Sequence, residues 1–395
     1  MTPTSCTRCE TPGYGRIKKV SLNYVEAMKV GDRPGCYRKE PGGDESFYGS
    51  YHALHILDLF NELAPIASGA LDVWAERFFD NQSEQGFFAA DAQVRRRPLG
   101  IDDMEPYWHF TRGNLWSLRL LNRKPPHPLR FLEPLLEPRA LYRWVKHYDW
   151  KNPWASANQV LAGATALFAA RDWFGAADVD RTMEQGMFPA LEELLDEKTG
   201  YWGTQFGAGP LDGLFGAIHV TPIYFAQKWP LRAVDRNVDA TLGCQRDDGS
   251  FWPGGSDCPD FDGAYMMANL AALTDYRRED LDAAARRYLD HALQHEDPNG
   301  VGWLLHRRDS KPSDWRPRPH WIWKPGAQEV VAEHRDEDPN RTHIMLGTWF
   351  YPLSIALIAH MLGDTGYEGP YRLNPMSLHQ CNVFSFNPPT TETVS

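Results

Sequence analysis

Gln245-Arg-Asp-Asp-Gly-Ser-Phe-Trp252 follows a pattern that occurs four times along the chain and points to a repeat fold. Each copy has an acidic or amide side chain, a glycine four residues later, and an aromatic residue close behind that glycine. The other copies are Gln82–Phe88, Asp196–Trp202 and Glu296–Trp303. Successive copies begin about 50 to 115 residues apart, which is the length of one or two helix pairs with their loops.

The pattern predicts a structural turn between helices. Glycine accepts a positive φ after a helix ends, the polar side chain can bond exposed backbone, and the aromatic residue fills the gap between neighbouring helix pairs. Helical candidates are found by period or composition, and no convincing alternating strands compete with them. They cover residues 47–63, 158–174, 235–242, 263–273 and 281–293. We therefore expect an all-α fold, an (α/α)6-type toroid of repeated helix pairs.

The chain is expected to divide into three parts around that toroid. Residues 1–45, rich in Gly, Pro and charge, predict an extended N-terminal arm, residues 46–365 a single toroid domain, and residues 366–395 a tail. The arm contains Cys6 and Cys9, and this is the only CxxC motif. Because no second cysteine pair lies nearby, we do not expect a zinc knuckle there.

Charge and hydropathy exclude some classes of partner. A net charge of −11 without a basic run argues against nucleic acid, since phosphate binding needs clustered Lys and Arg. Residues 344–363 are almost long enough to span a bilayer, but Pro352 and His360 favour an apolar inner helix of the toroid. Six scattered cysteines and the lack of a secretory signal predict a cytoplasmic location. Contact with a membrane surface stays open, and no protein partner is predicted.

The third copy of the turn also carries a family resemblance. Gln245–Trp252 resembles the Gln…Gly…Trp repeat of squalene and hopene cyclases and of their relatives, the class II terpene cyclases and protein prenyltransferase β subunits. These families place reactive acids at the start of the next inner helix, where this chain has Asp260-Phe-Asp262 before an apolar run. The resemblance implies a cyclase or isomerase in which Asp262 protonates an isoprenoid and Asp260 tunes it. The chain departs from the Asp-x-Asp-Asp motif at Gly263, which replaces the last carboxylate.

This chemistry would need a buried acid and an aromatic wall. A carboxylic acid stays protonated when it is buried beside a second carboxylate, and a carbocation is stabilised by aromatic faces. The 15 Trp residues make such a wall available. The candidates are Trp150, Trp154, Trp202, Trp252, Tyr265, Trp349 and Tyr351. The alternative for Asp257, Asp260 and Asp262 is a cluster that caps a helix beginning near Gly263.

Metal and cofactor sites are not expected. Protein prenyltransferases bind zinc near the equivalent acids, so a site formed by Asp260, Asp262 and His343 remains an alternative, although the position of His343 fits the family poorly. His52 and His55 share faces of the first strong helix, where a core or inner wall is favoured over metal ligation because no third ligand lies close in sequence.

A second function class comes from carbohydrate chemistry, because helical toroids also house polysaccharide lyases, epimerases and glycosidases. Asn158 lies near Trp150 and Trp154, and His219 precedes Tyr224 by five residues. An amide that neutralises a uronate, with His or Tyr removing a proton, would make a lyase. The substrate is therefore expected to be an isoprenoid or a glycan. A non-enzymatic toroid that binds a partner or lipid is a third class, against which the acid cluster argues.

Overall fold

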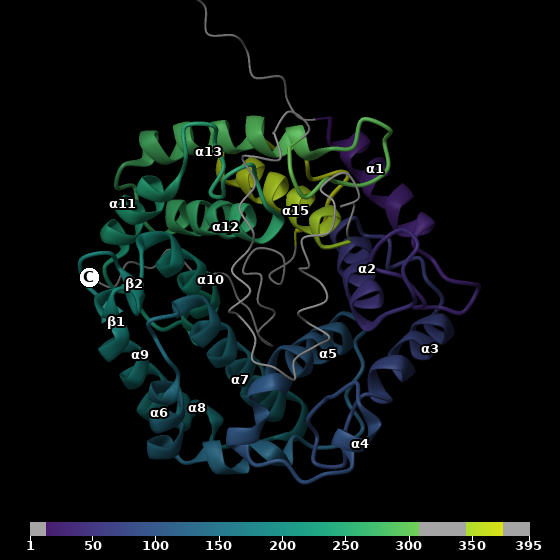
Figure 1. The fold of residues 1–395 in the computed structure, drawn as a ribbon, viewed down its shortest axis with the longest axis vertical. Helices are drawn as coiled ribbons and strands as arrows, with labels where there is room; N and C mark the ends of the chain where they lie inside the picture. Colours follow the sequence, from purple (N-terminus) through teal and green to yellow (C-terminus); the bar gives the residue numbers. More distant parts are fainter. Residues whose placement is uncertain (1–12, 308–344, 374–395) are drawn as a thin grey trace, which may run out of the picture.

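The computed structural model describes residues 13–307 and 345–373, and the helices in these ranges form two concentric rings (Figure 1). Six largely buried helices make the inner ring. They are α2 (Phe47–Leu59), α5 (Trp108–Leu120), α7 (Pro153–Phe174), α10 (Pro210–Ala226), α12 (Asp257–Leu273) and α15 (Met345–Met361). Each contacts the next along the chain, and α15 returns to contact α2. The ring is thus closed, and the predicted (α/α)6 toroid is confirmed.

The outer ring surrounds the inner one. Its members are α1 (Tyr14–Ala27), α3 (Ser68–Phe79), α6 (Pro138–His147), the segment α8 (Val179–Thr182) to α9 (Phe188–Leu194) with a π-helical turn η3 (Met183–Met187) between them, α11 (Val234–Cys244) and α13 (Arg278–Ala292). Helix α13 buries residues 281, 284, 285, 288 and 292, the spacing of a one-sided amphipathic helix. Inner helices such as α7 are instead buried nearly all round, because both rings contact them.

Shorter elements complete the connections. They are α4 (Ala92–Arg95), the 3-10 turns η1 (Ile101–Tyr107), η2 (Arg130–Leu136), η4 (Thr204–Phe206) and η5 (Leu293–His295), and a two-stranded hairpin of β1 (Leu195–Asp196) and β2 (Tyr201–Trp202). No helix in the described ranges is both long enough and apolar enough to cross a bilayer.

The repeated turns have the structural role that their sequence predicts. Gln82 Nε2 donates to the Gly86 carbonyl at 3.2 Å and to the His127 carbonyl at 2.8 Å. Gln245 Nε2 likewise donates to the Gly249 carbonyl at 3.1 Å and to Ala284 of α13 at 2.9 Å. Both glycines have positive φ, and an added Cβ would lie 2.2 to 2.3 Å from a backbone oxygen of the next segment. The turn therefore joins one helix pair to the following one.

Several boundaries differ from the sequence prediction. Residues 14–27 are not an extended arm but helix α1, which packs on α2 and α15. Tyr371 is buried against Phe60 of the ring and against Tyr14 of α1, so described residues of the expected tail also pack on the toroid. Helix α12 begins at Asp257, so its acids lie inside the first turns of the helix rather than before it.

Candidate functional site

Three contacts fix the orientation of α12. Asp260 bonds His291 of the outer helix α13, Phe261 stacks on Phe350 of α15, and Met266 contacts Thr221 of α10. An α-helix turns about 100° per residue. Asp262 consequently lies about 200° from Asp260, on the side of α12 that faces the axis of the ring. The two carboxylates of the predicted motif therefore point in nearly opposite directions.

Asp262 is a buried acid without a hydrogen-bond partner for its Oδ2 atom within the described part of the chain. Its side chain is 3% exposed. Burial raises its pKa well above the ordinary value, and the negative charge of Asp260 raises it further. The raised pKa favours the protonated form of Asp262, which is able to donate a proton.

His219 of α10 also faces the ring axis. Tyr224, five residues later, points outward, where its hydroxyl donates to Glu192 at 2.9 Å and its ring packs on Phe188 of α9. Five residues correspond to about 140° around the helix. The structure therefore does not bring the predicted pair His219 and Tyr224 together, and Tyr224 belongs to the packing between α9 and α10.

The tautomer of His219 follows from its surroundings. Its Nδ1 lies 2.7 Å from the Phe215 carbonyl and must donate to it, which leaves a lone pair on Nε2. Burial lowers the pKa of His219 to about 3, and the positive charge of Arg112 contributes to the decrease.

Arg112 of α5 is a buried cation held by two inner-ring groups. Its Nη1 donates to Asn158 Oδ1 of α7 at 2.5 Å, and the guanidinium lies 4.6 Å from the centre of the Trp116 ring. On α7, Gly163 faces Trp144 of the outer helix α6, so Asn158, five residues earlier, is turned toward the axis. A buried guanidinium beside an amide is an arrangement that recognises carboxylates.

His52 and His55 complete this side of the wall from α2. Ser50 faces outward and accepts from Trp74 of α3 at 2.7 Å, so residues two and five positions later face inward. The His55 ring lies 4.3 Å from that of Trp349 on α15. Burial lowers the pKa of His52 to about 3 and that of His55 well below its ordinary value. Both rings are neutral at pH 7.

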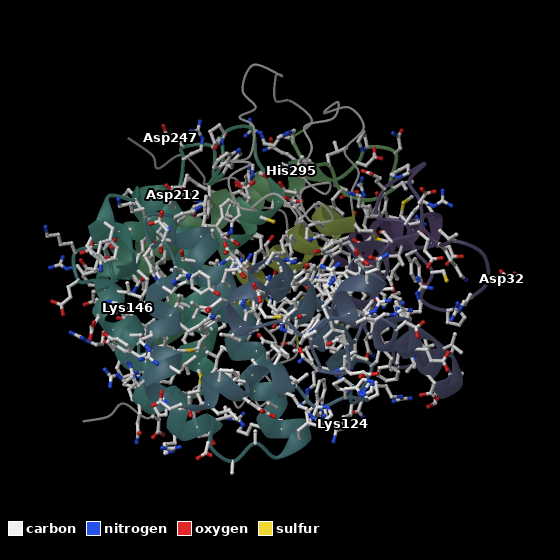
Figure 2. The ribbon with its side chains drawn as sticks, turned by 60° about the horizontal axis from the view of Figure 1, so that its bottom comes forward. Asp32, Lys124, Lys146, Asp212, Asp247 and His295 are labelled. Atoms are coloured by element: carbon white, nitrogen blue, oxygen red, sulfur yellow. The ribbon has the colours of Figure 1, made fainter. Side chains whose placement is uncertain are left out.

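These side chains come from five successive helices of the inner ring and face its axis, and we call them the inner-wall cluster. It comprises His52, His55, Arg112, Asn158, His219 and Asp262. Charged side chains such as Asp32, Lys124 and Asp247 instead lie around the periphery of the ring (Figure 2). The cluster combines one cation, one amide, three neutral imidazoles and one acid with a raised pKa, which is a set suited to binding a polar anion and moving a proton.

The predicted aromatic residues divide between this wall and the packing of the rings. Trp154 packs on Phe215, which lies one turn from His219, and Phe215 also contacts Trp252. Trp349 contacts His55, as described above. Trp150 donates to the Val145 carbonyl at 3.0 Å and Trp202 packs on the outward-facing Tyr224, so both are core residues.

Tyr265 and Tyr351 are fully buried on α12 and α15. The Tyr265 ring packs against Phe261, and the Tyr351 ring stacks on His295 at 4.1 Å between ring centres.

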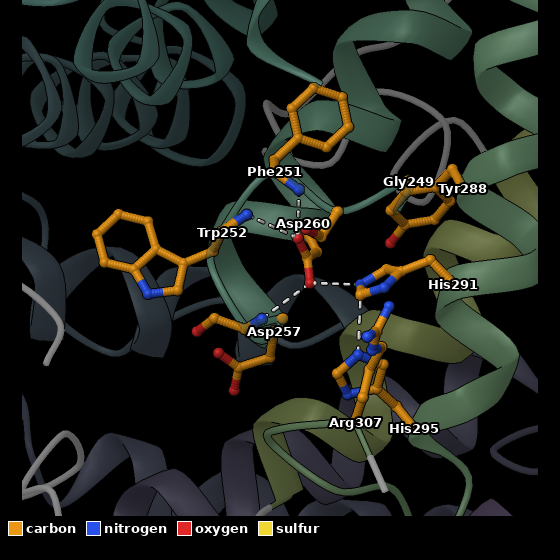
Figure 3. A network of polar contacts seen from close by, with 12 residues as sticks. Gly249, Phe251, Trp252, Asp257, Asp260, Tyr288, His291, His295 and Arg307 are labelled. Atoms are coloured by element: carbon orange, nitrogen blue, oxygen red, sulfur yellow. Dashed lines mark hydrogen bonds and ion pairs between the residues drawn. The ribbon is translucent and has the colours of Figure 1, made fainter. Parts of the chain in front are cut away.

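Asp260 holds a separate polar network on the outer side of α12 (Figure 3). Its Oδ1 accepts from the backbone N–H groups of Phe251 and Trp252 at 2.7 and 3.2 Å. Its Oδ2 accepts from Ser256 N at 2.8 Å and lies 2.9 Å from His291 Nε2. Asp260 therefore holds the turn at Gln245–Trp252 against α12 and α13. It also accepts from backbone N–H groups, as the predicted capping role requires.

The alternative zinc site does not form as the sequence suggested. Asp260 and Asp262 diverge around α12, so they cannot share an ion, and His343 and the Cys6–Cys9 motif lie outside the described residues. Sequence reasoning missed Arg112, for which no local motif exists. It also missed His291 and His295, whose spacing of four residues on one helical face was a readable signal.

Comparisons with known proteins give a distant likeness of shape. No family model matches the chain, and no curated protein sequence matches it significantly. Among solved structures, a polysaccharide lyase is 10% identical with a TM-score of 0.47, covering 87% of this chain and 96% of that one. The GH76A α-1,6-mannanase of Salegentibacter sp. HEL1_6 is 11% identical with a TM-score of 0.47, covering 88% and 99%. Its inactive variant in complex with α-1,6-mannotetrose is 9% identical with a TM-score of 0.48, covering 87% and 99%. With all scores below 0.5, these likenesses indicate no activity for this chain.

Proposed function

We propose that the inner-wall cluster acts on an acidic glycan and removes a proton from the sugar carbon next to a carboxylate, as a polysaccharide lyase does. The observation that carries this proposal is the Arg112–Asn158 pair on the same wall as the unprotonated Nε2 of His219. A buried cation favours an anionic, hydrogen-bonding substrate over a hydrocarbon, because carbocation chemistry requires a dry wall without positive charge.

Each residue has a defined role in the proposed elimination. Arg112 and Asn158 bind the uronate carboxylate and withdraw charge from it, which acidifies the neighbouring C–H bond. His219 Nε2 takes the C5 proton, the C4–O4 bond breaks, and a C4=C5 double bond forms. Asp262 donates its proton to the departing oxygen. The carboxylate also offsets the charge of Arg112, so substrate binding raises the pKa of His219 and strengthens it as a base.

The test is a search for unsaturated products. The purified chain is incubated with acidic glycans, including alginate, pectate and glycosaminoglycans, and ultraviolet absorbance of the unsaturated uronate is followed. His219→Gln should abolish the signal, whereas Tyr224→Phe on the outward side of the same helix should retain it. Equal loss in both variants, or no signal from the folded chain on any acidic glycan, would refute the proposal. Exchange of the C5 proton with deuterated water without cleavage would indicate an epimerase.

A second candidate is favoured by Asp262 alone. A buried acid with a raised pKa is what protonation of an isoprenoid alkene needs, and this is the function that the family resemblance implies. Incubation with linear isoprenoids followed by product analysis separates the two candidates. Cyclised products that disappear in Asp262→Asn and persist in His219→Gln would support the cyclase and exclude the lyase.

A further inference from the structure

The outer side of α12 holds a second cluster, separate from the inner wall. Asp260 Oδ2, His291 Nε2 and His295 Nε2 all lie within 4.8 Å of one another, and all three side chains are buried. The carboxylate oxygen is 2.9 Å from His291 Nε2, and the two imidazole nitrogens are 3.3 Å apart. Figure 3 shows the three groups converging from α12, α13 and the 3-10 turn η5 that follows α13. Neighbouring ligand atoms of a tetrahedral zinc ion are about 3.3 Å apart, given Zn–N bonds of about 2.0 Å.

The surroundings orient each group toward this common point. Three backbone N–H groups, of residues 251, 252 and 256, hold the Asp260 carboxylate. His295 Nδ1 lies 3.0 Å from the Leu304 carbonyl and donates to it, so its Nε2 carries a lone pair. Metal-binding histidines are typically held in this way by a backbone carbonyl on the other ring nitrogen.

Gly255 makes room for the His295 ring. It has φ +80°, and a Cβ at this position would lie 2.5 Å from His295 Cε1 and 2.6 Å from His295 Nε2. The approach of the imidazole to the backbone therefore requires glycine both sterically and conformationally.

Protons alone do not satisfy the cluster. His291 Nε2 faces two acceptors, Asp260 Oδ2 and His295 Nε2, and a neutral ring offers it a single proton. One of the two short contacts is then left without a hydrogen bond. The other ring nitrogen, His291 Nδ1, is buried and has no partner in the described ranges. A cation placed between the three ligand atoms removes this conflict.

We infer that Asp260, His291 and His295 bind a divalent transition metal, with Zn²⁺ as the preferred ion. A set of two imidazoles and one carboxylate binds Zn²⁺ in preference to the harder ions Mg²⁺ and Ca²⁺. The ion ties α12 to α13 and, through His295 and Leu304, to the segment after the fourth turn. It lies on the far side of α12 from Asp262, so its role is structural and independent of the proposed lyase chemistry.

The experiment measures metal content and metal uptake of the full chain. Protein from cells grown with added zinc is purified without chelators, and elemental analysis is expected to give about one zinc per chain. Stripped protein is then titrated with Co²⁺, whose absorption bands report tetrahedral nitrogen and oxygen ligation. His295→Gln should lower metal content at least tenfold, while His360→Gln, which removes an exposed histidine of α15, should leave it unchanged.

Thermal unfolding keeps the test decisive if a variant folds poorly. Zinc should raise the Tm of stripped wild-type protein and of His360→Gln, since a ligand that binds only the native state stabilises it. The inference is overturned if the folded wild-type chain contains no metal after purification and takes up neither Zn²⁺ nor Co²⁺. Equal metal content in His295→Gln and His360→Gln overturns it as well. Both readouts are independent of glycan cleavage, so failure of the proposed function leaves this test intact.

Discussion

The buried histidines of α2 should make the protein unstable in acid, with a slope that can be assigned to them. The pKa of His52 is lowered from 6.5 to about 3, and that of His55 is lowered as well. Between these values the unfolded histidine binds a proton and the native one does not, so the free energy of unfolding rises with pH. The stabilisation is fully present above pH 6.5 and is lost as pH falls toward 3. His52 contributes a slope of about 1.4 kcal/mol per pH unit, or about 5 kcal/mol over its full shift, and His55 adds to the slope in the same direction.

Urea unfolding at several pH values between 4 and 6 measures this slope. His52→Gln should reduce it by about 1.4 kcal/mol per pH unit relative to wild type, and the double variant with His55→Gln should reduce it further. Carboxylates contribute equally to wild type and variants, so they cancel in the difference. His360→Gln, which replaces an exposed histidine outside the inner-wall cluster, is the matched control. An unchanged slope in His52→Gln would show that His52 is solvated in the native state and would refute its place in the wall.

Three further changes test other parts of the structure. Asp262→Asn should be more stable than wild type at alkaline pH, because the raised pKa of Asp262 gives the wild type stability that is lost as pH rises above about 4 toward that pKa. Denaturant midpoints at pH 5 and pH 9 test this, and the same change in midpoint between these pH values in variant and wild type would contradict it. Gln82→Ala and Gln245→Ala should each lower the free energy of unfolding by about 1 to 3 kcal/mol, because each removes a side chain that bridges two backbone carbonyls; a loss in only one variant would mean that the two turns are not equivalent. Gly263→Ala should cost about 1 to 3 kcal/mol in thermal unfolding, since the new Cβ lies 2.2 Å from Phe251; a neutral result would place that ring elsewhere.

The fold was predictable because its signals are local. A glycine with positive φ and a polar side chain four residues before it are encoded within one turn, and four such turns predict a ring of helix pairs. In two of the turns that side chain is a glutamine that bonds the glycine carbonyl. The boundary of α1 was not predictable in this way. Its helix is rich in polar residues, and its buried side rests on α2 and α15, whose positions follow only from ring closure.

The site was predictable in part, for a reason that lies in helix geometry. Asn158, His219 and Asp262 were recognised as unusual polar residues in apolar helices, and all three face the ring axis. Their predicted partners Tyr224 and Asp260 do not, because offsets of five and two residues turn a side chain to another face of the helix. Arg112 lies on a helix that contributes no motif, and its significance appears only when α5, α7 and α10 are brought together.

Because α15 closes the ring, the chain can complete its fold only near the end of synthesis. The hydroxyl of Tyr14 reaches a carboxylate 350 residues later, and α1 packs on a helix that leaves the ribosome among the last. Until then α2 and α1 lack a neighbour along one side, and their apolar faces are open to solvent. We therefore expect nascent chains that stop before residue 345 to aggregate or to bind chaperones, whereas the complete chain becomes protease-resistant in one late step.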